Sequence, residues 1–178
     1  MITGPSGVGK GTLIRGVLER MPGLELSVSA TTRPPRAGEV DGRDYHFLSP
    51  EEFERRARAG EFVEHAVYAG NRYGTLRSEL DRPARGIVLE IDLQGARQLR
   101  DTLPEAMRVF IAPPSLEALE ERLRARGSDS ADQIRDRLAV APSELAAQQE
   151  FERVVVNDDR EQALGELVEL AATLCGPA

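Results

Sequence analysis

The sequence is poor in aromatic residues, in cysteine and in long apolar runs, and it carries no excess of positive charge. Only 4% of its 178 residues are aromatic and none is tryptophan, so aliphatic side chains must build the core. The apolar runs fall well short of the ~20 residues that a membrane-spanning helix needs. The net charge of −7 gives no support to a protein that binds nucleic acids or anionic membranes, since such proteins favour positive surfaces.

The single cysteine, Cys175, excludes an internal disulfide. No signal peptide precedes the first motif, and we therefore expect a protein of the reducing cytoplasm. The position of Cys175 near the C-terminus is typical of a bystander thiol rather than of a nucleophile.

Short apolar runs alternate with amphipathic segments in the second half of the chain. The runs lie at residues 87–92, 109–112 and 154–156. Runs of this kind predict parallel strands that are covered on both faces. The amphipathic segments lie at about residues 95–103, 115–126, 130–149 and 160–174, and the leucines expected to form the buried stripe of the second are Leu116, Leu119 and Leu123. The alternation predicts one doubly wound α/β domain with a parallel sheet.

The first half of the chain has a different pattern. It predicts a helix over about 10–21 and a strand over 24–29. A capping box with proline at the first helical position, Ser49-Pro50-Glu51-Glu52, predicts a second helix that ends near Gly60. Residues 61–73 read as a hairpin that turns at Gly70-Asn71. The stretch from about 30 to 76 therefore looks like an antiparallel insertion on the parallel sheet.

The first candidate for chemistry is the run Gly4-Pro5-Ser6-Gly7-Val8-Gly9-Lys10, which fits the P-loop pattern GxxxxGK at the start of a helix. Glycines let successive backbone N–H groups point at phosphate oxygens, and the helix N-terminus adds its positive end. Lys10 would supply a mobile cation for the β- and γ-phosphates of a nucleoside triphosphate. The alternative, a glycine-rich turn that only caps a helix, is disfavoured by the GK ending.

Two features of this motif depart from the usual layout. The position after the lysine, where Ser or Thr normally approaches Mg²⁺, holds Gly11, and the hydroxyl follows at Thr12. One residue is a rotation of roughly 100° on a helix, so direct ligation of the metal by Thr12 is left open. In addition, only three residues precede Gly4, although a strand of ~5–6 residues is usual before a P-loop. Either the start is placed too late, or the sheet lacks most of a central strand.

A pair of arginines marks a second phosphate site. Arg33 and Arg36 flank Pro34-Pro35, which favours polyproline II geometry with three residues per turn. The two guanidinium groups then project to one side and can bind a single phosphate, whereas the alternative reading is a solvated basic loop.

The chain resembles guanylate kinases over essentially its whole length and in the same order of motifs. The segments that carry the resemblance are Ser27 to Glu39 with TTRPPRAGE, Gly42 to Tyr45, Gly60 to Glu64, Tyr73-Gly74-Thr75, Glu90 to Gly95, Phe110 to Ser115 and Val156-Asn157-Asp158. TTRxPRxGE is highly specific, whereas a P-loop alone would not separate nucleotide kinases from other NTPases. Kinases with GKGT at this point are familiar in this group, so Gly11 does not count against activity.

The resemblance implies a role for each matching residue. On the GMP side it implies Ser29, Arg33, Arg36, Tyr45, Glu64, Tyr73, Thr75 and Asp92. On the ATP side it implies the loop from Gly4 to Lys10 with Gly11, Thr12 and Asn157. Catalysis would rest on Lys10, Arg33, Asp92 and two lid arginines, Arg126 and Arg137. His46 and His65 carry no motif and are expected to be structural.

Glu64 is the residue that the resemblance assigns to base recognition, with Ser29 and Thr75 near O6. Guanine presents N1–H and a 2-amino group side by side, and one carboxylate can accept from both. Adenine offers neither donor there and would leave a buried carboxylate unpaired. From the residues alone, Glu64 could equally be a surface strand residue.

The resemblance therefore implies transfer of the γ-phosphoryl group of ATP to GMP or dGMP, with Mg²⁺ as cofactor and no nucleic acid or membrane as partner. It also implies the organisation of the domain. The core would comprise residues 1–28, 77–119 and 150–178, the GMP-binding insertion 29–76 and the lid about 120–149. Two alternatives are a guanylate-kinase-like scaffold module that has lost ATP chemistry and a kinase for another nucleotide such as AMP. The intact P-loop disfavours the first, and Ser29 with Glu64 disfavours the second.

Overall fold

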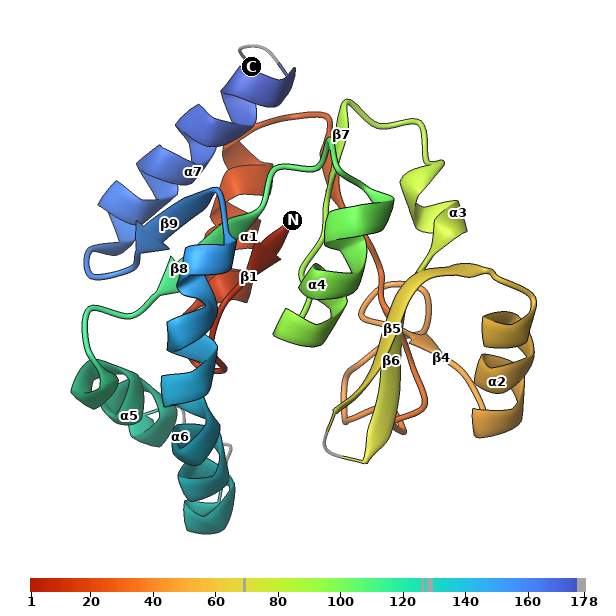
Figure 1. Ribbon diagram of the computed structural model, residues 1–178, viewed down its shortest axis with the longest axis horizontal. Helices are drawn as coiled ribbons and strands as arrows, with labels where there is room; N and C mark the ends of the chain where they lie inside the picture. The colour runs from red at the N-terminus through yellow and green to blue at the C-terminus, as the bar shows by residue number, and fades with distance from the viewer. Residues whose placement is uncertain (69, 126, 128–129, 176–178) are drawn as a thin grey trace.

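The computed structural model describes residues 1–68, 70–125, 127 and 130–175, and it contains a parallel sheet at its centre (Figure 1). The parallel strands are β1 (Ile2–Thr3), β2 (Leu24–Leu26), β7 (Gly86–Val88), β8 (Val109–Ala112) and β9 (Arg153–Val156). Strand β8 pairs with β1 and β9, and β2 pairs with β7. A bridge between Ile2 and Glu90 joins the two parts, which gives the order β2-β7-β1-β8-β9. This confirms the expected α/β fold.

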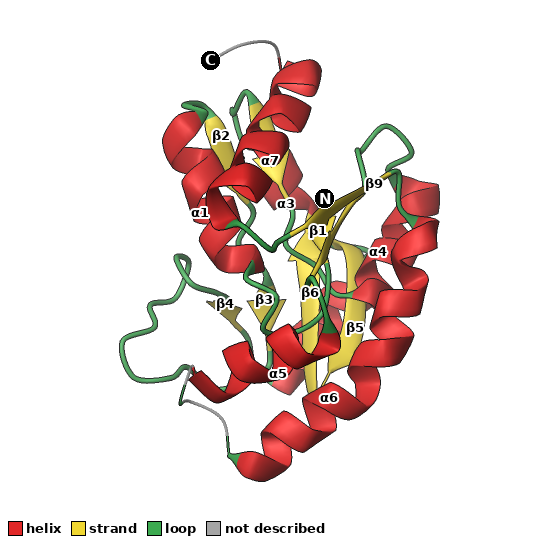
Figure 2. Ribbon diagram, turned by 90° about the vertical axis from the view of Figure 1, so that its left-hand side faces the viewer, coloured by secondary structure: helices red, strands yellow, loops and turns green. Residues whose placement is uncertain are grey.

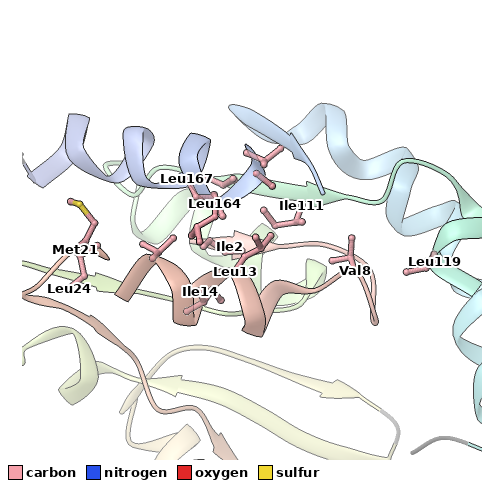
Figure 3. Packing of buried hydrophobic residues seen from close by; sticks show 14 of the residues in the cluster. Ile2, Val8, Leu13, Ile14, Met21, Leu24, Ile111, Leu119, Leu164 and Leu167 are labelled. Atoms are coloured by element: carbon pink, nitrogen blue, oxygen red, sulfur yellow. The ribbon is translucent and has the colours of Figure 1, made fainter. Parts of the chain in front are cut away.

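Two hydrophobic clusters cover the sheet. On one face, helices α1 (Lys10–Arg20) and α7 (Arg160–Cys175) pack together, and Leu13, Leu164 and Leu167 meet Ile111 of β8 (Figure 3). On the other, Leu99 of α4 (Leu93–Thr102) packs with buried residues that follow β7. Aliphatic side chains supply almost all of this core, as the composition requires. No helix in the described part of the chain is both long and apolar enough to cross a membrane.

The antiparallel stretch forms a separate small sheet to one side of the core (Figure 1). Its strands are β3 (Ala30–Thr31), β4 (His46–Phe47), β5 (Phe62–Tyr68) and β6 (Asn71–Leu76), in the order β4-β3-β6-β5. We call it the antiparallel sheet after its β3–β6 and β5–β6 pairs, although β4 pairs with β3 in parallel, contrary to the expectation of a wholly antiparallel insertion. Helix α2 (Pro50–Arg58) buries Phe53, whose ring stacks on Phe62 at 4.4 Å. The short helix α3 (Arg77–Leu80) leads the chain back to the core.

Two helices that pack against each other lie on the opposite side of the molecule from the antiparallel sheet (Figures 1 and 2). They are α5 (Leu116–Ala125) and α6 (Ala131–Ala146), and a 3₁₀ turn, η1 (Ala147–Glu150), follows α6. Ser130 and Gln133 form a complete capping box at the start of α6. The capping box expected at the start of α2 is only half formed. The amide of Glu52 donates to the hydroxyl of Ser49, but the carboxylate of Glu52 binds Arg55 and Arg56 instead of the backbone of Ser49.

Several sequence expectations were wrong in detail. Leu116 is 39% exposed, because it is the first residue of α5 and lies beyond the core that Leu119 and Leu123 enter. Strand β9 forms an edge of the sheet, so Val154 and Val156 are exposed rather than covered. The strand expected over 24–29 ends at Leu26. The amide of Ser27 still donates to the carbonyl of Val88, and the next amide, that of Val28, donates to the carboxylate of Glu79.

Strand β1 occupies the central position but has only two residues, and an apolar cavity of 440 Å³ lies beside its start. Val17 of α1, Leu103 after α4 and Leu167 of α7 are among the side chains that line it. The amino group of Met1 donates to the carbonyl of Met107 at 2.6 Å, and burial lowers the pKa of this amine to about 6. The apolar cavity thus lies beside the shortest strand of the parallel sheet in the described part of the chain.

We expect an engineered extension to fill this cavity. Four apolar residues fused ahead of Met1, such as Val-Ile-Val-Ile, would continue β1 between β7 and the segment before β8. Burying one such side chain contributes roughly 1.5–3 kcal/mol, and 1 kcal/mol corresponds to about 2–4 °C in a domain of this size. The extended protein should therefore melt several degrees higher by calorimetry. A Gly-Ser-Gly-Ser extension is the control, and equal melting temperatures for the two extensions would contradict the expectation.

Candidate active site

One cavity of 330 Å³ lies where β1 and β7 end, between the P-loop and the antiparallel sheet. Ligands of open α/β sheets bind at this edge. Its lining residues come from segments far apart in the chain and are Gly4, Ser6, Lys10, Leu26, Ser27, Ser29, Asp44, Tyr45, Glu64, Ala66, Tyr68, Tyr73, Gly74, Glu90, Ile91, Asp92, Arg137 and Glu144. The structure thus brings the P-loop lysine and the candidate base-binding glutamate into one space.

Lys10 begins α1, and its side chain turns back toward the P-loop. Its Nζ donates to the carbonyls of Gly4 at 2.8 Å and Pro5 at 3.1 Å. Burial lowers the pKa of Lys10, while the nearby carboxylates of Glu90, Glu144 and Asp92 oppose that shift. The loop therefore holds a desolvated cation at the cavity, where an anionic ligand would gain most from it.

A set of contacts behind the P-loop fixes its crest at Val8. The side chain of Asn157 donates to the carbonyl of Val8 at 2.8 Å and is buried. Arg122 of α5 donates to the carbonyl of Asn157 at 2.8 Å. Asn157 lies behind the loop rather than in the cavity, and Arg122 carries no motif that would have drawn attention to it.

Three residues are candidates for binding Mg²⁺: Thr12, Glu90 and Asp92. Thr12 is exposed on α1 and does not line the cavity, whereas Glu90 and Asp92 do. Within the described ranges, no group of three His, Cys, Asp or Glu residues could hold a metal ion. Two carboxylates beside a phosphate site fit Mg²⁺, which keeps several waters and binds through one or two carboxylates plus phosphate oxygens.

Glu64 lies in β5, where the strand register shifts, and only 6% of the residue is exposed. The hydroxyl of Thr75, in β6, donates to its Oε1 at 2.7 Å. Burial raises the pKa of Glu64 to about 7. Thr75 is fully buried beneath the carboxylate, so it acts on the cavity through Glu64, whereas Ser29 lines the cavity directly.

Helix α4 approaches Glu64 at a glycine. A Cβ on Gly95 would lie 2.5 Å from a carboxylate oxygen of Glu64, so any other residue there would displace that carboxylate. The amide of Gly95 donates to Oδ1 of Asp92 at 2.8 Å, which makes Asp92 the N-cap of α4 as well as a lining residue.

Arg33 is held in a fixed orientation by its neighbours. Its guanidinium makes two hydrogen bonds to Glu39, at 3.0 and 2.9 Å, and lies 5.3 Å from the centre of the Tyr45 ring. The bonds to Glu39 raise the pKa of Arg33, and the hydroxyl of Tyr73 lies close enough to contribute. Burial raises the pKa of Tyr45.

Arg36 lies apart from this group. Its backbone amide donates to Glu39 at 2.6 Å and the residue is exposed. The structure therefore brings Arg33, Tyr45 and Tyr73 together, with Tyr45 and Tyr73 lining the cavity and Arg33 and Arg36 outside its lining.

Helix α6 brings Arg137 and Glu144 to the cavity, and Arg137 contacts the hydroxyl of Ser6. Arg126 lies outside the described residues. Sequence reasoning missed Glu144, which is partly buried. Burial raises the pKa of Glu144 and Lys10 opposes the shift. The spacing could have found it, since seven residues are about two helical turns and place Glu144 on the same face as Arg137.

The raised pKa of Glu64 predicts a stability difference that depends on pH. The pKa of this carboxyl is higher in the folded than in the unfolded chain, so its contribution is fully present below about pH 4.5 and is lost as the pH rises through about 7. Wild type should lose about 2 kcal/mol of unfolding free energy relative to Glu64→Gln between pH 5 and 8. Urea unfolding of both proteins at the two pH values checks this. Parallel pH profiles would show that Glu64 is not titrating as a buried group.

Comparisons with known proteins agree with this geometry. The sequence matches the family described as guanylate kinase over residues 1–173. It is 56% identical to the guanylate kinase of Synechocystis sp. over 173 residues, which is 96% of this chain and 91% of that protein. It is 53% identical to the guanylate kinase of Frankia casuarinae over 96% of this chain and 94% of that one.

Solved structures give the same picture. The crystal structure of guanylate kinase from Anaplasma phagocytophilum superposes with a TM-score of 0.75 at 32% identity, covering 98% of this chain and 84% of that one. Shikimate kinase from Bacteroides thetaiotaomicron, at 18% identity and a TM-score of 0.52, covers 96% of this chain and 95% of that one and shares the fold alone.

Proposed function

The chain belongs to the guanylate kinase family and transfers the γ-phosphoryl group of ATP to GMP, and we propose that its two nucleotides meet in the cavity between the P-loop and the antiparallel sheet. The observation that carries this assignment is that Lys10 and Glu64 line the same cavity. One is suited to a triphosphate and the other to a base with adjacent N–H donors.

On the acceptor side, Glu64 recognises guanine and the arginines hold the phosphate. The ionised carboxylate accepts from N1–H and the 2-amino group, while Ser29 and the Thr75–Glu64 bond fix the O6 side. Arg33, Arg36, Tyr45 and Tyr73 bind the phosphate of GMP. Glu39 keeps the guanidinium of Arg33 in place before GMP arrives, which lowers the entropy lost on binding.

On the donor side, the P-loop from Gly4 to Thr12 surrounds the phosphates of ATP, with Asn157 supporting the loop from behind. Binding of the triphosphate would draw Lys10 away from the carbonyls of Gly4 and Pro5 and onto the β- and γ-phosphates. Glu90 and Asp92 line the cavity and are the carboxylates that would hold Mg²⁺ through its waters, and the ion would supply positive charge to these phosphates.

Catalysis then requires alignment rather than proton abstraction. The acceptor phosphate, with a second pKa of about 6, is already largely dianionic at neutral pH. Lys10 and Arg137, with Arg126 of the same segment, neutralise charge on the transferred group, and Arg33 and Asp92 keep the attacking oxygen in line.

We assign the core to residues 1–28, 77–119 and 150–178, the GMP-binding insertion to 29–76 and the lid to about 120–149. Insertion and lid flank the cavity and would close over their nucleotides. Such closure excludes water that would otherwise hydrolyse ATP.

A coupled assay of ADP production with GMP, AMP, UMP and CMP tests this function. We expect turnover with GMP far above the other three acceptors. Faster turnover of AMP would overturn the base assignment. A folded protein with no turnover on any acceptor would instead support a scaffold module that has lost ATP chemistry.

A further inference from the structure

The carboxylate of Glu79 lies buried at the junction between the core and the antiparallel sheet. The chain crosses this junction twice, after β2 and again through α3, and Glu79 belongs to the second crossing. Only 7% of the residue is exposed, although an isolated buried carboxylate is costly. Nothing in the catalytic scheme uses it.

Glu79 binds groups from both crossings and from the antiparallel sheet. Its Oε2 accepts from the amide of Val28 at 2.7 Å and from Arg82 at 2.7 Å. Its Oε1 lies 2.9 Å from Nε2 of His46 in β4, and Nε2 must donate because a carboxylate only accepts. Arg82 also donates to the carbonyl of Leu26 at 3.1 Å, which ties the group to the end of β2.

These contacts enclose Ser29. Val28, its neighbour in the chain, is held by Glu79 directly. The carbonyl of Ser29 itself accepts from the amide of His46 at 2.9 Å, and the ring of the same histidine binds Glu79. The backbone of Ser29 is therefore fixed on both sides by residues that share one buried carboxylate.

We propose that Glu79 is a positioning residue for guanine recognition, which holds Ser29 at the distance that the base requires. This inference rests on the proposed role of Ser29 at O6 of GMP. If the segment after β2 shifted by a fraction of an ångström, the proposed contact between Ser29 and O6 of GMP would lengthen. The P-loop, which lines another part of the same cavity, would not be affected. A residue that only stabilised the fold would affect both nucleotides alike.

The main test is Glu79→Gln, which keeps the size and shape of the side chain. Its amide N–H₂ cannot accept hydrogen bonds, so part of the donor set of Val28, His46 and Arg82 loses its acceptor. We expect the KM for GMP to rise about five- to tenfold, with the KM for ATP within about twofold, since charge-assisted hydrogen bonds are the strong ones. In a Ser29→Ala background the same substitution should add less than about twofold, because linked residues are not additive. Glu54→Gln is the control, since Glu54 also binds two basic side chains, Arg58 of α2 and Arg72 of β6, and lies outside the lining of the cavity.

A second pair of variants serves if Glu79→Gln folds poorly. His46 is partly exposed, so His46→Ala should fold, and it should raise the KM for GMP. His46→Gln should restore the wild-type value, because the amide N–H of glutamine can replace Nε2–H.

The outcomes separate the two ideas. Ser29→Ala with an unchanged KM for GMP would refute the role of Ser29, and with it the proposal. If Ser29→Ala is impaired, the proposal on Glu79 alone fails in either of two cases. In the first case, the effects of Glu79→Gln and Ser29→Ala on the KM for GMP are additive, or Glu79→Gln raises the KM values for GMP and ATP equally. In the second case, Glu79→Gln and His46→Ala both keep the wild-type KM for GMP.

Discussion

Replacing Glu64 with glutamine should lower kcat/KM for GMP by about 10²-fold while leaving the KM for ATP nearly unchanged. The carboxylate can accept two hydrogen bonds from guanine, whereas an amide accepts at one atom and presents its own donors to the other. Loss of one charge-assisted bond and an unpaired buried donor together cost roughly 3 kcal/mol. Steady-state kinetics with GMP and AMP at pH 8, where Glu64 is ionised, measure the effect.

The preference for GMP over AMP should fall further than the activity itself. The amide N–H₂ of glutamine can donate to N1 of adenine, which the carboxylate of Glu64 cannot do. Thermal melting of the variant serves as the control, because Glu64→Gln removes a titrating buried acid and should not unfold the protein. An unchanged ratio of GMP to AMP efficiency would remove Glu64 from base recognition.

Lys10→Met should lower kcat by roughly 10³-fold without loss of stability. Removing one preorganised electrostatic group from a transition state typically costs about 10²–10³ in rate, and the proposed function assigns Lys10 to the β- and γ-phosphates. Methionine has nearly the same length and no charge to desolvate, and the folded protein already lowers the pKa of Lys10. Single-turnover phosphoryl transfer at saturating ATP and GMP is the appropriate measurement.

Arg20→Met is the matched control for Lys10→Met. Arg20 ends the same helix that Lys10 begins, and it forms a surface ion pair with Glu161, so its loss should change the rate less than about twofold. A Lys10→Met enzyme that keeps more than about a tenth of the wild-type rate would show that the lysine binds the loop rather than the transition state.

The sequence predicted the elements whose signals are local. Ser49 and Pro50 marked the start of α2, and the short apolar run at 109–112 became β8 at the centre of the core. Periodicity also placed α5 correctly, although it could not say that Leu116 would fall outside the core. The exposure of Leu116 depends on how far the neighbouring segments of the core extend, and the periodicity of one helix carries no information about that.

The site was harder to predict, because burial and partners are tertiary properties. From the residues alone Glu64 could equally be a surface strand residue, and only the pairing of β5 with β6 places Thr75 beneath it. The resemblance to a known family supplied its role, whereas the raised pKa required the structure. Glu144 and Glu79 carry no motif, and their importance follows from what surrounds them. The roles proposed for the individual site residues stay predictions until the variants are measured.

Asp92 has both a structural role, as the N-cap of α4, and a proposed role in the active site, and this combination limits how the position can change in evolution. The same carboxylate caps α4 and lines the cavity proposed for the nucleotides, and α4 in turn places Gly95 against Glu64. Losing a cap costs ~1 kcal/mol, and a helix start that shifts would disturb the base pocket as well. Substitution at Asp92 is therefore pleiotropic: selection for folding and selection for guanine specificity act on one side chain, and neither trait can drift independently of the other.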